Sequence, residues 1–307
     1  SESFCQQLVH LRLCRWVIPP TAPPTPHTPT SHTCKSCRPQ RRRRKTDDCN
    51  TCDAGYQRTA AVALGVFARH AVGVGAAGPA MEATVAVLGH KPSAVELIDR
   101  MIIQLSRESL GFARRTTFVE GDPEALLVVE FFGESEQELR GKIDALKKDM
   151  QRRRLGYAWV VAMKPEEQVD IWAIRTAGLG LLMGVKGDTK PLPFVEDTAV
   201  VPEKLPEYVR RFDEIVRSHG TQAAYYGHAS EGCLHIRPLI NIKQEEGLSK
   251  LVSIATDISD LVLEFGGSLS GEHGDGIVRG VWAEKMFGTA LYNAFRELKR
   301  TFDPQGI

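Results

Sequence analysis

The sequence contains no long uninterrupted run of apolar residues. Nowhere in its 307 residues is there a stretch of about 18 apolar side chains, roughly the length needed to cross a bilayer. The segment LVHLRLCRWVI near the start is short and charged, and no small-residue cleavage site follows it. This pattern argues against a membrane span. It predicts a cytoplasmic protein, with peripheral binding at the inner membrane face as the open alternative.

Cysteine is scarce over most of the chain. Six of the seven cysteines lie in residues 1–60, and only Cys233 follows them. A disulfide framework is therefore not expected in the later part, which fits a reducing compartment. The first 60 residues also hold ten Lys/Arg against four Asp/Glu, which leaves 29 against 34 for the rest. The chain thus divides into a basic, Pro- and Cys-rich segment and a mildly acidic body that is long enough to bury a substantial core.

The basic segment has a formal zinc-binding pattern. Two CxxC pairs, separated by eleven residues, are formed by Cys34, Cys37, Cys49 and Cys52. The sequence between the pairs offers almost no apolar residue to pack a zinc ribbon, although the basic run 41–45 could contact phosphates. We therefore expect residues 1–60 to be disordered or spurious. A zinc-knuckle protein that binds nucleic acid through residues 34–52 is the alternative, and no nucleic-acid partner is expected.

From about residue 82 the hydrophobic pattern becomes regular and alternates between strand and helix periods. Strands are predicted at 82–88, 125–133, 157–163, 194–200, 222–228 and 233–242. Helices are predicted at roughly 93–108, 135–152 and 245–265, and within 203–220, where Gly220 ends the helix. These repeats predict an α+β fold, in which helices cover a largely antiparallel sheet in ferredoxin-like strand–helix units. Residues 61–81 are expected to be a linker or a remnant.

The strand predicted at 233–242 has one apolar face and one polar face. Side chains alternate across a strand, so one face is expected to hold Leu234, Ile236, Ile240 and Ile242. The opposite face is expected to hold Cys233, His235, Arg237 and Asn241. The polar face of such a strand contacts either solvent or a binding site.

Two glycine-bounded loops, GHASEGCLH and GGSLSGEHGDG, carry the residues that could do chemistry. If both loops lie at one end of the sheet, His228, His235 and Glu272 supply two imidazoles and a carboxylate, a set that can bind catalytic zinc with one position open. His273 then remains free to act as a base. Ordinary loop residues, and a metal-assisted hydrolase with the same ligands, are the alternatives.

Arg175 lies at the end of the helical pattern PEEQVDIWAIRTA. A guanidinium at this place is a candidate clamp for a carboxylate, because it can donate two parallel hydrogen bonds. A surface arginine with no binding role is the alternative.

Three segments in this order, GHASEGCLHIRPL, LVLEFGGSLSGEHGDG and LYNAFRELKRTFDPQGI, resemble the C-terminal domain of FAD-linked oxidases. This group includes D-lactate dehydrogenase, glycolate oxidase subunit and D-2-hydroxyglutarate dehydrogenase. The resemblance covers about residues 82–307 and implies a substrate-binding domain that follows a separate FAD-binding domain. Because residues 1–81 show no glycine-rich FAD loop and the chain stops at FDPQGI, we expect a fragment that is truncated at its end and inactive alone.

The resemblance also implies roles for individual residues. It implies that His228, His235 and Glu272 ligate zinc or a similar divalent metal, that His273 takes the hydroxyl proton of a small 2-hydroxy acid, and that Arg175 binds the substrate's carboxylate. Arg237 is also expected to bind substrate, and it stands where the hydroxyglutarate enzymes have asparagine. The cofactors implied are FAD and the metal, with an electron acceptor of unknown identity.

Overall fold

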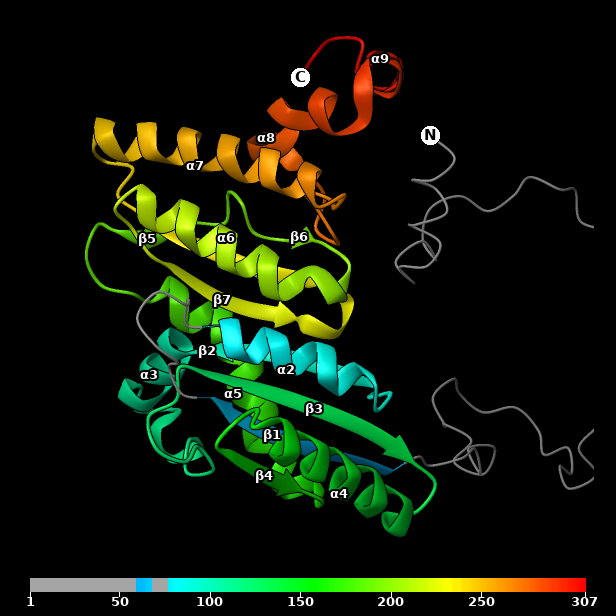
Figure 1. Ribbon diagram of the computed structural model, residues 1–307. Coiled ribbons are helices and arrows are strands. Elements are labelled where there is room, and N and C mark those ends of the chain that lie inside the picture. The colour runs from blue at the N-terminus through cyan, green and yellow to red at the C-terminus, as the bar shows by residue number, and fades with distance from the viewer. Residues whose placement is uncertain (1–58, 68–76) are drawn as a thin grey trace, which may run out of the picture. The chain divides into compact units, whose positions relative to one another are not determined.

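The computed structural model describes residues 59–67 and 77–307, and in this part of the chain helices cover both faces of an antiparallel sheet (Figure 1). The strands are β1 (Thr59–Phe67), β2 (Ala94–Asp99), β3 (Ala125–Gly133), β4 (Ala158–Ala162), β5 (Lys190–Pro191), β6 (Thr198–Ala199), β7 (Ala223–His228) and β8 (Cys233–Ile240). Their order is β4-β1-β3-β2-β7-β8-β5, and β6 pairs with β8. The α+β fold class predicted from the sequence is confirmed. Residues 1–58 of the basic segment, with the two CxxC pairs, lie outside the described residues, so the disorder expected there stays a prediction, whereas residues 59 and 60 begin β1.

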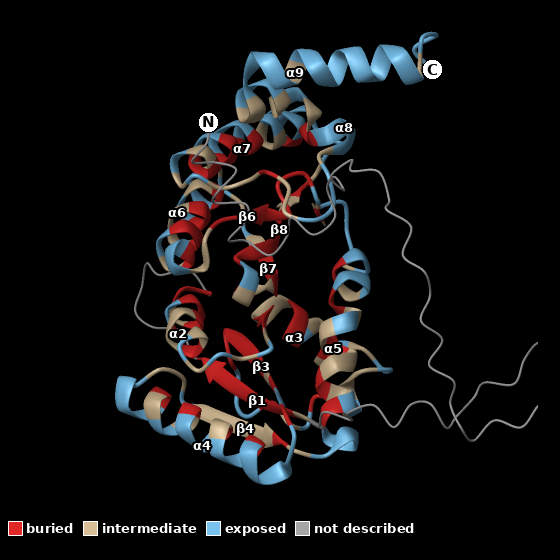
Figure 2. Ribbon diagram, turned by 90° about the vertical axis from the view of Figure 1, so that its right-hand side faces the viewer, coloured by how far each residue is buried: buried red, intermediate tan, exposed pale blue. Residues whose placement is uncertain are grey.

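Two helical layers enclose the sheet, as the turned view shows (Figure 2). One face is covered by α2 (Gly78–Leu88), α4 (Glu136–Arg153), α6 (Leu205–Ser218) and α7 (Glu245–Glu264). The other face is covered by α3 (Arg100–Glu108) and α5 (Pro165–Met183). The short α8 (Gly276–Arg279) and the long α9 (Ala283–Phe302) follow, and α9 projects from the body with no buried residue. No helix among the described residues is long and apolar enough to cross a membrane.

The amphipathic helices form where their apolar stripes predict them. In α4, Ser135 accepts a hydrogen bond from the Glu138 backbone N–H at the first turn, and Glu138 reaches back to the Glu134 N–H. The stripe of α4 is buried at Leu139, Ile143, Leu146 and Met150. Helix α6 likewise buries an apolar stripe, formed by Tyr208, Val209, Phe212 and Val216, and the chain leaves it at Gly220 with a positive φ of 70°. Both helices therefore dock on the sheet through their apolar faces.

Two of the predicted elements are wrong in type. Residues 82–88 belong to helix α2, not to a strand, and Pro79 stands in the first turn of that helix, where proline is favoured. The helix predicted at 93–108 is strand β2 followed by helix α3. Asp99 divides them, because its side chain accepts from the Ile102 N–H and caps α3. Short apolar runs fit either period, and tertiary packing decides between them.

The boundaries predicted around residues 61–81 and 194–200 are also corrected. The expected linker contains residues 61–67 of β1, which lies between β3 and β4 and has buried side chains, and it contains the start of α2. The expected strand at 194–200 is reduced to the two residues of β6, because Asp197 turns the chain with a φ of 73°. The first correction makes β1 an inner strand of the sheet.

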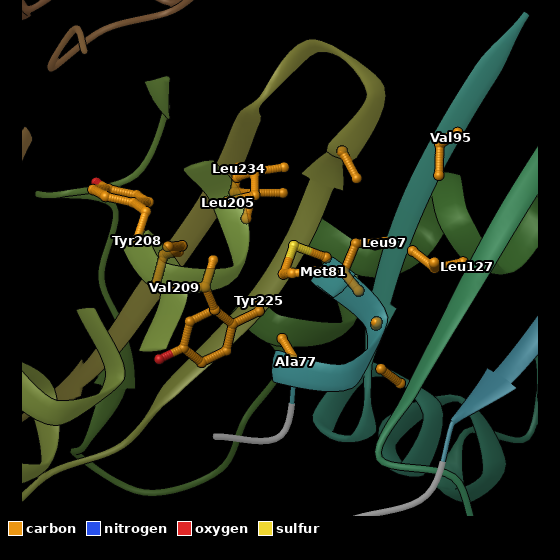
Figure 3. Packing of buried hydrophobic residues seen from close by; sticks show 14 of the residues in the cluster. Ala77, Met81, Val95, Leu97, Leu127, Leu205, Tyr208, Val209, Tyr225 and Leu234 are labelled. Carbon is orange, nitrogen blue, oxygen red and sulfur yellow. The ribbon is translucent and has the colours of Figure 1, made fainter. Parts of the chain in front are cut away.

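The core continues across the boundary between β2 and β7 (Figure 3). Met81 of α2 lies near Leu97 of β2, and Tyr225 of β7 lies near Val209 of α6. All four side chains are buried in one hydrophobic cluster. The sheet is thereby held as one continuous body, with the polar face of β7 and β8 turned away from α6 and α7.

Candidate metal and substrate site

The alternation predicted for 233–242 is confirmed within β8, but the prediction is wrong for Ile242, which lies beyond the end of the strand and is 48% exposed. Leu234, Ile236 and Ile240 are buried in the cluster beneath α6 and α7. His235 and Arg237 are each only 5% exposed, yet they are absent from that cluster and make polar contacts with acidic side chains. The polar face of β8 is therefore buried against acidic side chains and is not a solvated surface.

His228 ends β7 and lies opposite Glu96 on the neighbouring strand β2. Directly opposed residues in an antiparallel pair lie close enough for side-chain contact. The Nδ1 of His228 is 2.7 Å from Oε1 of Glu96. The turn from β7 to β8 then passes through Gly232, whose φ of 70° is a left-handed conformation that glycine adopts without strain.

The loop that carries Glu272 and His273 is anchored by one buried carboxylate, that of Asp197. Its Oδ1 accepts from the Glu272 backbone N–H at 3.1 Å, and its Oδ2 accepts from the His273 N–H at 2.9 Å. Ser270 Oγ donates to Oδ2 at 2.6 Å, and the Gly271 N–H donates to the Asp197 carbonyl at 2.7 Å. Asp197 is completely buried, so these contacts replace its hydration and fix the loop against β8.

Three imidazoles converge on a single carboxylate oxygen, Oε1 of Glu272. The Nε2 atoms of His228, His235 and His273 lie 3.4, 3.2 and 3.3 Å from it. The rings of His235 and His273 are stacked, with centroids 4.9 Å apart. The structure thus brings together all four of the residues predicted from the two glycine-bounded loops.

The atoms that converge in this cluster carry lone pairs that repel one another unless a positive charge lies among them. With its Nδ1–H directed at Glu96, neutral His228 presents a bare lone pair at Nε2, which faces the lone pairs of Glu272. The Nδ1 of His235 is buried and has no hydrogen-bond partner in the described part of the chain. A cation shared by the two Nε2 atoms and the carboxylate removes the repulsion, so the residues fit a divalent metal.

The two predicted ligand histidines have opposite electrostatic environments. Burial, with the neighbouring His228 and His273, lowers the pKa of His235 to about 3, so its imidazole stays neutral. The hydrogen bond to Glu96 raises the pKa of His228 above its ordinary value, although burial opposes this. A neutral imidazole is the form that binds metal, and a carboxylate behind the second imidazole makes it a more basic ligand.

The two predicted substrate arginines border this cluster, and each is paired with a glutamate. Arg175 places Nε and Nη2 at 2.7 Å from Oε2 of Glu96, and its guanidinium lies 5.4 Å from the centre of the Tyr226 ring. Arg237 Nη2 is 2.5 Å from Oε2 of Glu196. Each guanidinium keeps N–H donors that are not paired with its glutamate.

Sequence reasoning missed three acidic residues of the site, which are Glu96, Glu196 and Asp197. Glu96 was assigned to a helix, although the alternation in AVELID places it on the opposite face from Val95 and Leu97. Glu196 and Asp197 are two consecutive acids within an apolar segment, and both are buried. That combination is a signal that could have identified them.

A second grouping of possible ligands consists of Asp197, His235, Glu272 and His273, whose candidate donor atoms lie within 4.8 Å of one another. It differs from the predicted set by including Asp197 and His273 in place of His228. Both oxygens of Asp197 are already occupied by backbone and hydroxyl donors. We therefore assign Asp197 to holding the loop and keep His228 in the candidate ligand set.

Comparison with known proteins gives consistent results. The family described as "FAD linked oxidases, C-terminal domain" matches residues 68–307, so the match begins before residue 82. A D-2-hydroxyglutarate dehydrogenase of Pseudomonas putida is 33% identical over 227 residues, which cover 71% of this chain and 22% of that protein. A D-lactate dehydrogenase of Archaeoglobus fulgidus is 30% identical over 217 residues, which cover 70% of this chain and 44% of that protein.

Among solved structures, p-cresol methylhydroxylase with substrate bound superposes with a TM-score of 0.55 at 9% sequence identity. The superposition covers 80% of this chain and 51% of that one. At this identity the likeness is one of fold alone. The chain thus spans about half of that structure, less than half of the A. fulgidus relative and less than a quarter of the P. putida relative.

Proposed function

Because the chain belongs to the family of FAD-linked oxidase C-terminal domains, we propose that it is the substrate-binding part of an FAD-dependent 2-hydroxy acid dehydrogenase. The substrate class is a small 2-hydroxy acid of the D-lactate, glycolate or D-2-hydroxyglutarate type, and the product is the 2-oxo acid. The names of the two relatives support this class. FAD and the contact with the electron acceptor are assigned to other parts of a longer protein, since the relatives extend well beyond the matched region.

The observation that carries this proposal is the convergence of three Nε2 atoms on Oε1 of Glu272. In this proposal His228, His235 and Glu272 hold a divalent metal, zinc by the preference of a two-histidine, one-carboxylate set. When bound, the metal polarises the hydroxyl and carboxylate of the substrate, and a bound flavin supplies the hydride acceptor.

The chain's own residues bind and deprotonate the substrate. His273 is 45% exposed and stacks on His235, so it can reach a substrate that lies over the cluster. It takes the hydroxyl proton at Nε2, while its Nδ1 faces Glu196 at 3.7 Å. Arg175 and Arg237 direct their remaining N–H donors to the substrate's carboxylate. The paired glutamates limit the net positive charge at this site.

Metal binding by this chain tests the ligand set. Zinc bound per chain is measured by elemental analysis after dialysis, and affinity by competition with a chromophoric chelator. We expect about one zinc per wild-type chain, and His228→Ala is expected to lower the affinity by at least about 100-fold, since one of three ligands is lost. His219→Ala is the matched control, because His219 follows the end of α6 and pairs with Asp257 of α7. Retention of zinc in His228→Ala at wild-type affinity contradicts the assignment.

Flavin reduction in the full-length protein tests the reaction. D-lactate, glycolate and D-2-hydroxyglutarate are each added under anaerobic conditions, and bleaching of the flavin absorbance measures reduction of the flavin. We expect at least one to reduce the flavin, and His273→Asn to slow reduction by about 100-fold or more, the usual contribution of a general base. Hydrolytic activity without flavin reduction would favour the metal-assisted hydrolase instead. The cytoplasmic location stays a prediction from the sequence.

A further inference from the structure

Glu96 connects two residues of the site that come from different segments of the chain. Its Oε1 lies 2.7 Å from Nδ1 of His228, and its Oε2 lies 2.7 Å from Nε and Nη2 of Arg175. The glutamate is 7% exposed and stands in the middle of the sheet, on β2. A buried carboxylate with one oxygen on an imidazole and the other on a guanidinium is fully satisfied by these contacts.

The contact with Oε1 determines which nitrogen of His228 carries the proton. A carboxylate accepts hydrogen bonds only, and of the two His228 nitrogens Nδ1 makes the shorter carboxylate contact, 2.7 Å to Glu96 against 3.4 Å from Nε2 to Glu272, so in the neutral ring Nδ1 is the protonated one. Neutral His228 is thereby held as the Nδ1–H tautomer, with the Nε2 lone pair directed at Glu272 and His235. An imidazole that is free to rotate or to change tautomer offers this lone pair only part of the time.

The contact with Oε2 holds Arg175 at the edge of the same cluster. The guanidinium is fixed between Glu96 and the face of Tyr226, and its side chain is 14% exposed. Without the glutamate, a largely buried positive charge loses its partner and turns towards water. One carboxylate therefore sets the orientation of a metal-binding group and of a substrate-binding group.

From these contacts we infer that Glu96 is a positioning residue, which fixes the tautomer of His228 and the direction of Arg175. The inference rests on the proposed function, in which His228 binds metal and Arg175 binds the substrate's carboxylate. Glu96 itself does not touch the position between the imidazoles, so its effect passes through these two partners.

The test compares Glu96→Gln with Glu130→Gln in the full chain. Glu130 lies opposite Ala94 on the adjacent strand β3, so its side chain is on the same face of the sheet, and it is half-buried. Two quantities are measured: the tautomer of His228 by nitrogen-15 NMR of the metal-free protein, and the affinity for zinc by chelator competition. Thermal unfolding shows that each variant is folded.

For Glu96→Gln we expect His228 to become a mixture of tautomers and the affinity for zinc to fall about 10- to 100-fold, the usual effect of losing such a partner. Glu130→Gln is expected to keep the wild-type tautomer and to change the zinc affinity less than about 3-fold, because Glu130 acts on Glu96 through its charge and takes no part in the hydrogen bonds to His228 and Arg175. Glu96→Asp keeps the charge but withdraws the carboxylate by one methylene. It is expected to lower the affinity as well, and serves if the glutamine variant does not fold.

The outcomes separate this inference from the proposed function. A wild-type chain that binds no zinc overturns the proposed metal site. A Glu96→Gln chain that keeps both the pure Nδ1–H tautomer and the wild-type affinity overturns the positioning role of Glu96 alone. In the full-length enzyme, loss of the hold on Arg175 is expected to raise KM for the 2-hydroxy acid, and an unchanged KM contradicts that part of the inference.

Discussion

Replacing Gly232 by alanine is predicted to destabilise the protein severely, because the added methyl group has no room. Gly232 lies between the two candidate ligands His228 and His235, and its φ is 70°. A Cβ built on it falls 1.8 Å from the carbonyl oxygen of Val200. Ordinary carbon–oxygen contact is nearly twice that distance, so one of the two backbone segments must move.

The loss can be worked out in two parts. The left-handed conformation costs a residue with a side chain about 1–2 kcal/mol. Displacing the segment also breaks the hydrogen bond from the Val200 N–H to the Gly232 carbonyl, which is 3.1 Å long. Leaving such a buried group unpaired costs about 1–3 kcal/mol. The free energy of unfolding is therefore expected to fall by about 2–5 kcal/mol on these estimates.

Gly187→Ala is the matched control, because it isolates the conformational part. Gly187 has a φ of 90°, and a Cβ there meets nothing within 4 Å. This variant is expected to lose only the cost of the conformation, about 1–2 kcal/mol. Urea unfolding of both variants and of the wild type measures the difference. If Gly232→Ala loses no more stability than Gly187→Ala, the steric reasoning fails.

Two further predictions concern helix α4 and the buried acid Asp99. Gly141 lies on the exposed side of α4 with open space around it, so Gly141→Ala is expected to raise the free energy of unfolding by about 1 kcal/mol, and a lower urea midpoint would contradict this. Burial raises the pKa of Asp99 from 3.8 to about 7. Ionisation therefore opposes folding, and stability should fall as pH rises from about 4 to about 7, by an amount on the order of 4 kcal/mol from this residue. Asp99→Asn should flatten that part of the urea-measured pH profile, and an unchanged slope would refute the assignment.

The parts of the fold that could be predicted are those in which a local pattern and the tertiary environment agree. Helices α4 and α6 each carry one continuous apolar stripe, and β8 alternates cleanly, so periodicity alone identifies what each buries. Helix α2 carries many small and β-branched residues with little asymmetry, and it buries residues from more than one side, including Ala80, Met81, Ala83 and Val87. In that case tertiary packing, which cannot be read from the local hydrophobic pattern, determines that this segment is a helix and not a strand.

The candidate site divides in the same way. His228, His235, Glu272 and His273 could be found because glycines and short spacing mark their loops. Glu96 could not, because its role depends on the register of β2 against β7, a long-range pairing between residues 96 and 228. The pairing of Arg175 with a glutamate was missed for the same reason, since both partners must be placed in space before their contact is visible.

The pairing of β2 with β7 has a consequence for the energetics of the whole sheet. It involves only three residue pairs, Glu96 with His228, Leu97 with Gly227 and Ile98 with Tyr226. This short seam joins the strands β4-β1-β3-β2 to the strands β7-β8-β5, and it carries two groups of the candidate site. A ligand that binds only the closed seam stabilises it by mass action, by about 2.7 kcal/mol at a hundred times its Kd. Occupancy of the site and cohesion of the two half-sheets are therefore thermodynamically linked, and hydrogen exchange at the amides of the facing pair Leu97 and Gly227 would slow as the site fills.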